Sequence, residues 1–327
     1  MRLRAGVAID LGTVNTLVYM AGQGIVVDEP SAIALDKESG RLVAVGLEAD
    51  SLSDKEPVGV EVLHPLRDGV IADLDAAAAM LQAFLRKARV RRGLLRPAAV
   101  VCVPSGATWV ERRSLAAAVE SVRPRCRVRL VEEPVAAAAG AGHDLAEGAG
   151  AFIVDIGGGT TEAAVLAGGH VVRCQSLRLA GNAMDEAIMQ AVRTEFGLLI
   201  GRNAARRLKM TLGLGEDATG FLEVVGVDVA RRTPRVVYVP ASVIAAALTQ
   251  PITMIADSVE AMLSDIPPNL AEDVVRGKIR LAGGGALLPG LAARIEAAAG
   301  IPTAVVDDPL RCVVRGAAEI LQRPDPS

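Results

Sequence analysis

The stretch from Ala151 to Glu162 places strong limits on how this chain can fold. It begins with four apolar residues, short enough for a buried strand, and Asp155 follows near the end of that strand. Three glycines, Gly157 to Gly159, then allow backbone N–H groups to approach a bound anion closely. The apolar residues from Ala163 to Leu166 predict a second strand, so the stretch is a hairpin rather than the strand-to-helix turn of a P-loop.

The side chains around this turn suit the phosphates and the metal ion of a nucleotide. Asp155 can hold Mg²⁺, directly or through water, and Thr160 and Thr161 can donate hydrogen bonds to phosphate oxygens. An ordinary glycine-rich turn remains the alternative for this motif taken alone.

Two further motifs favour the nucleotide. The stretch from Val7 to Tyr19 is again strand, Asp10, Gly-Thr turn and strand, which suggests two similar halves facing one nucleotide. A third glycine cluster, Gly283 to Gly285, follows a predicted strand at residues 279–281. There we expect the glycines to open a helix that lies against a phosphate or a nucleoside. The three motifs in this order resemble the actin, Hsp70 and sugar-kinase ATPase superfamily.

Composition narrows the class of protein further. The 327 residues predict about two domains, and a hydrophobic content of 51% is ample for sizeable cores. The net charge of −3 gives no overall attraction to nucleic acid, which we do not expect as a partner. The four cysteines show no metal-ligand spacing and fit a reducing cytosol. We expect no signal peptide before the first strand, and no uncharged apolar run reaches membrane-spanning length.

One stretch is much more basic than the rest of the chain. Residues 86–96 carry six cations in eleven residues, with Leu94 and Leu95 near the end. The first interpretation is a solvated helix end with both leucines turned inward. The second is a membrane-touching loop, with Arg91, Arg92 and Arg96 on anionic headgroups and the leucines in the interface.

A pair of carboxylates, Glu132 and Glu133, stands at a predicted helix start with Pro134 just inside it. At such a position acidic residues ordinarily complement the helix dipole. Between two phosphate hairpins, one of them could instead orient a water molecule for attack on a γ-phosphate.

Within the superfamily, the chain resembles the bacterial actin MreB family over essentially its whole length. Sugar kinases and Hsp70 share only the hairpins. The segments that carry the resemblance are residues 10–13, 15–19, 69–73, 103–108, 111–113, 132–134, 155–162, 184–188, 267–268, 283–288 and 308–310.

This resemblance implies an α/β actin-like ATPase fold: two RNase H-like domains, each with a small inserted subdomain, and a nucleotide cleft between them. The large subdomain of the first half is expected at residues 1–31, 63–142 and 310–327, with residues 32–62 inserted. The large subdomain of the second half is expected at residues 143–181 and 241–309, with residues 182–240 inserted.

The resemblance also implies a site for ATP, or GTP as an alternative, with Mg²⁺. Asp10 and Asp155 would organise the metal through water, and Glu133 would position the hydrolytic water; these three form the catalytic set. The cofactor-binding residues would be Gly12, Thr13, Asn15, Thr16, Gly157, Gly158, Gly159, Thr160, Thr161, Arg206, Lys209, Gly283, Gly284, Gly285 and Ala286.

By the same resemblance, the chain would form head-to-tail filaments on the inner face of the cell membrane and organise cell-wall synthesis and cell shape. Its partners would be itself, an anionic membrane surface reached through the Leu94–Leu95 loop, and membrane proteins of cell shape or cell-wall synthesis. The chain departs from the family at Arg206 and Thr211, where acidic residues are usual. A second hypothesis is therefore a pseudo-ATPase scaffold of the same fold, with weak or no hydrolysis.

Overall fold

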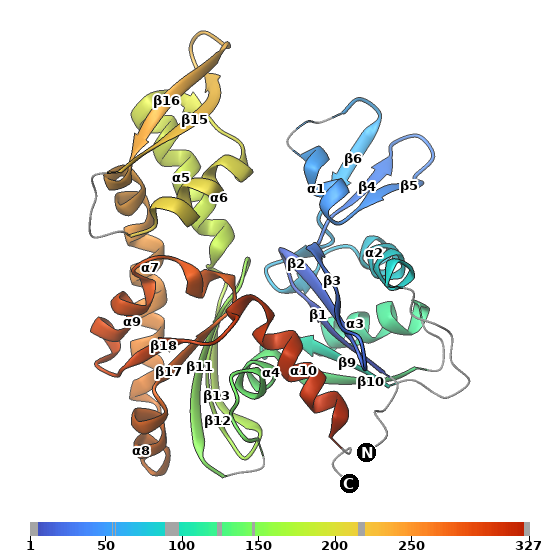
Figure 1. Cartoon of the computed structure of the whole chain (residues 1–327), viewed down its shortest axis with the longest axis vertical. Coiled ribbons are helices and arrows are strands. Elements are labelled where there is room, and N and C mark those ends of the chain that lie inside the picture. The colour runs from blue at the N-terminus through green and yellow to red at the C-terminus, as the bar shows by residue number, and fades with distance from the viewer. Residues whose placement is uncertain are drawn as a thin grey trace.

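The computed structural model describes residues 6–53, 55, 57–88, 98–122, 126–145, 148–214 and 220–323. Two five-stranded sheets form two halves, and each half carries a smaller lobe at the same end of the molecule (Figure 1). Helices α4 and α10 lie between the two sheets.

The first sheet has the strand order β10-β9-β1-β2-β3. Strands β1, β2 and β3 are antiparallel neighbours, whereas β9 and β10 run parallel to β1. Helices α2 and α3 cover one face, where Met80, Leu81 and Phe84 are fully buried, as the helical spacing predicts. The elements are β1 (Gly6–Leu11), β2 (Asn15–Met20), β3 (Gly24–Pro30), α2 (Leu74–Lys87), β9 (Ala98–Val103), α3 (Trp109–Val122) and β10 (Arg127–Glu132).

The second sheet repeats the first, with the order β13-β12-β11-β17-β18. Its first three strands are again antiparallel, and β17 and β18 again run parallel to the first strand of the half. The pattern of strand, Asp, glycine turn and strand, which occurs twice in the sequence, therefore corresponds to a sheet topology that also occurs twice. The elements are β11 (Gly150–Ile156), β12 (Thr161–Ala167), β13 (His170–Leu177), α5 (Gly181–Phe196), α8 (Pro268–Gly277), β17 (Ile279–Ala282), α9 (Leu291–Ala299) and β18 (Thr303–Val305).

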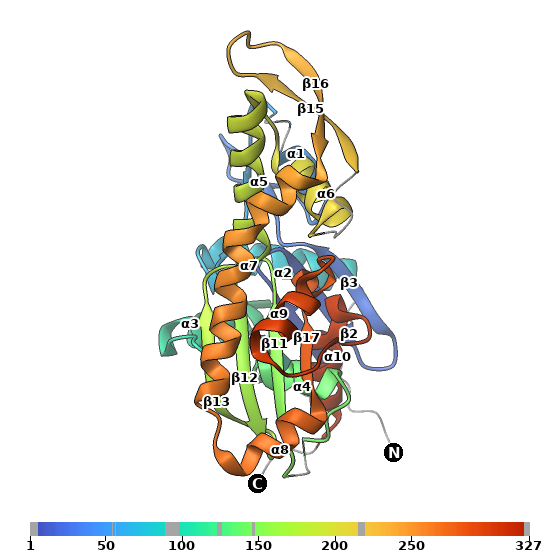
Figure 2. The same ribbon diagram turned by 90° about the vertical axis from the view of Figure 1, so that its left-hand side faces the viewer.

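Helix α7 (Ala241–Ser264) runs over β12 and β13 along the second half (Figure 2). A proline inside a helix usually kinks or ends it, but α7 continues through Pro251. Pro251 is buried, and packing of Leu248, Ile252 and Ile255 into the core holds both sides of it in one helix. By length and composition alone, α7 could cross a membrane; here its buried residues belong to the core of the second half.

The two sheets rest on a pair of closely crossing helices, α4 (Glu133–Gly140) and α10 (Cys312–Gln322). A Cβ on Gly140 would lie 1.9 Å from the Cys312 carbonyl oxygen, and one on Gly316 would lie 1.8 Å from that of Ala136. Only glycine allows this approach. The surrounding cluster is built largely from alanines and takes residues from both sheets, so it joins the two halves.

The smaller lobes each contain a three-stranded sheet. The elements of the first lobe span residues 33–63, beside the predicted insertion at 32–62, and those of the second span residues 198–240, inside the predicted 182–240. The domain boundaries themselves remain a prediction. The first lobe contains β4 (Ile33–Asp36), β5 (Leu42–Val45), α1 (Leu47–Ser53) and β6 (Val60–Leu63); the second contains β14 (Leu198–Leu199), α6 (Arg202–Leu212), β15 (Phe221–Asp228) and β16 (Pro234–Pro240).

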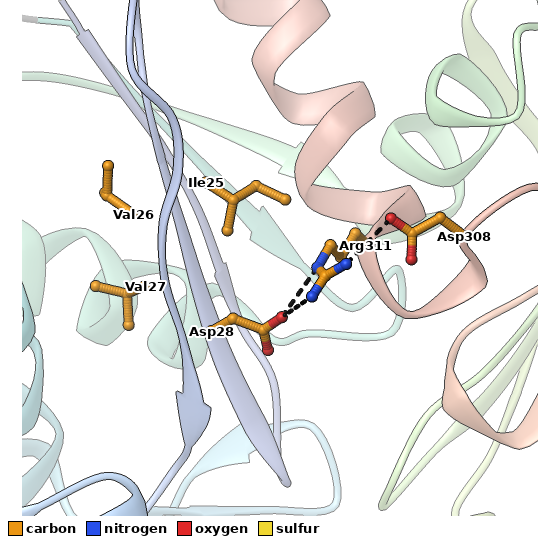
Figure 3. A pocket seen from close by; sticks show the side chains of 6 residues that line it. All are labelled: Ile25, Val26, Val27, Asp28, Asp308 and Arg311. Atoms are coloured by element: carbon orange, nitrogen blue, oxygen red, sulfur yellow. Dashed lines mark hydrogen bonds and ion pairs between the residues drawn. The ribbon is translucent and has the colours of Figure 1, made fainter.

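A short 3₁₀ turn, η2 (Pro309–Arg311), leads from the second half back into α10 of the first. Figure 3 shows the Arg311 guanidinium between two carboxylates: Nε and Nη2 lie 2.9 Å from Asp28 Oδ2, and Nη1 lies 3.5 Å from Asp308 Oδ2. With residues 25–27 they line an open cavity of about 470 Å³. The ion pairs hold the crossover segment against strand β3.

Candidate nucleotide site

The two glycine hairpins meet turn to turn. A Cβ on Gly158 would lie 2.0 Å from Val14 Cγ2, and one on Gly159 would lie 3.0 Å from Thr13 Oγ1. Thr13 Oγ1 also accepts a hydrogen bond of 2.9 Å from the Gly69 N–H. Gly69 belongs to a third turn, between β7 (Leu66–Arg67) and β8 (Val70–Ile71). The two motifs predicted to face one nucleotide thus lie in direct contact.

Other backbone bonds fix each turn. The Gly12 N–H donates to the Asn15 carbonyl at 3.1 Å, and the Gly157 N–H donates to the Thr160 carbonyl at 2.9 Å. At the start of α5, the Asn182 N–H donates to the Gly158 carbonyl at 2.8 Å. These bonds hold the glycine backbone in place before any ligand arrives.

Two of the predicted nucleotide-binding residues, Thr16 and Thr161, direct their hydroxyls into the protein. The Thr16 hydroxyl is fully buried and bonded to the Ser31 hydroxyl at 2.8 Å. The Thr161 hydroxyl is also buried and donates to the Leu179 carbonyl at 2.7 Å. The Thr161 hydroxyl, which we expected to donate to a phosphate, therefore donates within the protein instead, and the nucleotide-binding role of both residues remains a prediction. Strand alternation turns both side chains toward the core, where each one anchors its hairpin.

Four carboxylates gather below the turns. Burial, and then the charge of Asp155, raises the pKa of Asp10 to about 7, and burial raises that of Asp155 to about 6. Burial and the neighbouring charge of Glu162, then those of Asp10 and Asp155, raise the pKa of Glu133 well above its ordinary value. When ionised, these four buried carboxylates repel one another. A bound cation would reduce this repulsion.

Glu162 is the member of this cluster that the sequence analysis did not single out as a site residue. Its side chain is almost fully buried, and burial, with a smaller contribution from Asp155, raises its pKa to about 7. The Ser105 N–H lies 3.1 and 3.3 Å from its two oxygens and lowers that pKa in part. The sequence signal that could have identified Glu162 as a site residue is its position seven residues after Asp155, just beyond the glycine turn.

The donor set suits Mg²⁺ held mainly through water and phosphate. Among the described residues, no group of three or more His, Cys, Asp or Glu side chains is placed to ligate a metal ion by itself. Mg²⁺ usually keeps several waters and takes only one or two protein carboxylates. Asp10 and Asp155 fit that pattern, and burial raises the pKa of both side chains.

The third glycine motif lies directly beside Asp155. A Cβ on Gly283 would lie 2.3 Å from Asp155 Oδ1, and one on Gly285 would lie 2.3 Å from Ile156 Cγ2. The expected helix is a single 3₁₀ turn, η1 (Gly284–Leu287), in which the Ala286 side chain is buried. All three glycine motifs therefore converge on the end of strand β11.

Arg206 and Lys209 lie together on α6. Lys209 Nζ is 2.7 Å from Asp185 Oδ1 and donates to the Gly181 carbonyl at 2.8 Å. Burial lowers the pKa of Lys209, and Asp185 opposes this shift. Arg206 Nε lies 3.8 Å from Asp185 Oδ2. Gly181 lies beside the Gly157 carbonyl, so this charge cluster borders the second hairpin. No site role was predicted for Asp185 from the sequence.

The proposed membrane residues Arg91, Arg92, Leu94, Leu95 and Arg96 lie outside the described residues. Their role remains a prediction.

Two duplicated halves that meet at paired glycine hairpins define the actin-like ATPase fold. A structure of MreB5 from Spiroplasma citri bound to ADP matches with a TM-score of 0.91 and 32% identity over 97% of this chain and 96% of that one. The MamK double helical filament shares the fold, with a TM-score of 0.83.

Sequence comparison gives the family. The family model described as MreB/Mbl protein matches residues 4–326. The cell shape-determining protein MreB of Escherichia coli is 40% identical over 97% of this chain and 93% of its own length. The cell shape-determining protein Mbl of Bacillus subtilis is 35% identical over 98% and 96%. The chain belongs to the MreB/Mbl family.

Proposed function

We propose that this chain is an ATP-binding, filament-forming actin homologue and a slow ATPase. The observation that carries the proposal is the convergence of three glycine motifs on Asp155, amid four buried carboxylates. Glycine backbones suit phosphate oxygens, and the buried, mutually repelling carboxylates suit a divalent cation. A solved relative is described as bound to ADP and another structure of it as bound to AMPPNP, which supports a nucleotide here.

In this proposal each group has a distinct task. The N–H groups of Gly158 and Gly159, and the N–H groups of the first turn other than that of Gly12, hold the phosphates in place. Glu133, at the start of α4, orients a water molecule and accepts its proton; the burial that raises its pKa makes the ionised carboxylate a stronger base. Mg²⁺, held by Asp10 and Asp155, would supply charge neutralisation of the phosphates.

The relatives support a proposed cellular role. Relatives at 35–40% identity are named as cell shape-determining proteins, and a structural neighbour is described as a filament. We propose that this chain forms head-to-tail filaments that polymerise with nucleotide on the inner face of the cell membrane. There they would organise cell-wall synthesis and cell shape together with membrane proteins. The Leu94–Leu95 segment would make the membrane contact.

Three measurements test the proposal on purified protein: equilibrium binding of ATP and GTP with and without Mg²⁺, phosphate release, and sedimentation of polymer. Glu133→Ala should keep nucleotide binding while phosphate release falls about 10-fold or more, because a positioned base or water-orienting group is lost. Asp155→Asn should instead weaken Mg²⁺-dependent binding itself, since it removes a metal-organising charge.

Glu319→Gln is the matched control, because Glu319 is an exposed carboxylate of α10. Unchanged phosphate release in Glu133→Ala would remove Glu133 from the mechanism, and unchanged affinity in Asp155→Asn would remove Asp155 from the site. A wild-type chain that binds no nucleotide would overturn the proposed function as a whole.

A second candidate function is a scaffold of the same fold that turns over little or no ATP. The observation that favours it is Arg206, a cation beside Asp185 at the border of the second hairpin. Binding and polymer formation without phosphate release would select this alternative.

A further inference from the structure

Arg112, on the first turns of α3, contacts two segments that lie apart in the sequence. Its Nη2 lies 2.9 Å from Glu132 Oε1, at the end of strand β10. The same side chain donates to the carbonyls of Ser105 and Ala107, from Nη2 at 3.4 Å and from Nε at 3.2 Å. One guanidinium therefore ties the loop after β9 to the end of β10.

Both tied segments lead to a carboxylate of the candidate site. Glu132 immediately precedes Glu133 and is the N-cap residue of α4, so its position sets where that helix begins. The Ser105 N–H donates to both oxygens of Glu162. Glu162 is the carboxylate whose charge, after burial, contributes most to raising the pKa of Glu133.

The first turn of α3, which carries Arg112, is itself held in place. The Thr108 N–H donates to Glu111 Oε2 at 2.6 Å, and the Glu111 N–H lies 3.3 Å from Thr108 Oγ1, which is a capping box at the start of α3. The planar guanidinium has donors in a rigid fork, so it can hold several acceptors in a fixed relative geometry. A Lys ammonium at this position would keep the charge but lose the fork.

We propose that Arg112 is a positioning residue for phosphate release, acting on Glu133 through Glu132 and on Glu162 through Ser105. It touches neither nucleotide nor metal in this proposal. Its loss leaves nucleotide affinity unchanged and lowers the rate at saturating nucleotide, because a small displacement of a catalytic group is enough to slow a reaction. The inference rests on the proposed ATPase function.

The test compares Arg112→Ala, Arg112→Lys and the matched control Arg113→Ala in full-length protein. Arg113 is the next residue of α3 and is exposed, so its variant removes the same charge from the same helix. Arg112→Ala should lower kcat for phosphate release about 10-fold with unchanged nucleotide Kd. Arg112→Lys should recover part of the rate, and Arg113→Ala should match wild type.

A second variant keeps the inference falsifiable if Arg112→Ala folds poorly. Glu132→Gln breaks the same ion pair from the other side, and should lower kcat with unchanged Kd. Combined with Arg112→Lys, it should cost less than the two single effects together, because both remove one interaction.

Three results would each contradict the proposal in a different way. Equal kcat in wild type, Arg112→Ala and Glu132→Gln would overturn the positioning role while leaving the ATPase intact. Equal losses in Arg112→Ala and Arg113→Ala would also overturn it, since the effect would come from charge alone. If nucleotide binds but the wild-type chain releases no phosphate, the ATPase function fails, and the positioning role with it.

Discussion

Gly158 of the second hairpin lies against Val14 of the first, with the space for a Cβ on Gly158 filled by Val14 Cγ2 at 2.0 Å. The two residues belong to different halves of the molecule, so this contact sets how closely the hairpins approach. Val14 Cβ would lie at 2.9 Å from the same added atom, and the β-branched side chain has little freedom to turn away.

Gly158→Ala should therefore separate the hairpin turns and weaken nucleotide binding about 10-fold or more, since the phosphate donors would move apart. Val14→Ala removes the nearest atom and should restore part of the affinity in the double variant. Isothermal titration with ATP and Mg²⁺ on the wild type, the two single variants and the double variant measures the coupling between the two substitutions. Additive effects of the two substitutions would contradict a direct steric contact.

Arg206→Glu should tighten ATP binding, because it removes a cation from a position where the resemblance to the family implies an acidic residue. The same change brings a carboxylate near Asp185, so thermal stability without nucleotide should fall slightly. Isothermal titration gives the sign of the first effect and a melting curve that of the second. Arg202→Glu, one turn earlier on α6 and exposed, is the matched control.

Weaker binding in Arg206→Glu would show that Arg206 itself contacts the base or a phosphate. Equal affinity in the variant and the wild type would place Arg206 outside the pocket.

The nucleotide-free chain without metal should lose stability as the pH rises from about 4.5 to about 7. The pKa of Asp10 is raised to about 7, that of Asp155 to about 6 and that of Glu162 to about 7. A carboxyl group with a raised folded-state pKa contributes stability that is fully present below its unfolded pKa. That contribution is lost as the pH rises through the folded-state value.

Melting temperatures in a chelating buffer across this range check the prediction. Asp10→Asn should flatten the slope, because it removes one of the groups that must ionise in a buried place. A wild-type melting temperature that rises steadily over the same range would contradict the acid cluster as the source.

Leu94→Ser with Leu95→Ser should reduce binding to anionic vesicles, by roughly 1.5–3 kcal/mol per leucine at most. The physical reason is an apolar pair in the most basic stretch of a slightly acidic chain. The loss should be largest for polymer, where many copies act together. Co-sedimentation with anionic and neutral liposomes at two salt concentrations measures it.

Replacing Arg91, Arg92 and Arg96 by glutamine should make the remaining binding less sensitive to salt. Equal pelleting of the leucine variant and the wild type on anionic vesicles, with equal polymerisation, would show that the leucines belong to the core.

The sequence alone was sufficient for the duplicated architecture and for the meeting of the glycine motifs. Each hairpin follows from neighbours in the chain: an apolar run, Asp10 or Asp155, a glycine turn and a second apolar run. The start of α4 beside Pro134 was likewise predicted from a local signal. Patterns of this kind act within a few residues, where backbone geometry limits the choices.

Only the tertiary structure decided which polar groups meet. Thr16 and Thr161 carry hydroxyls that could bind a phosphate, but both hydroxyls are buried and hydrogen-bonded within the protein. Glu162 receives a hydrogen bond from Ser105, 57 residues away, and Asp185 pairs with Lys209 on another helix. These partners are chosen by packing between distant segments, because a buried polar group must find its acceptor or donor wherever the fold places one.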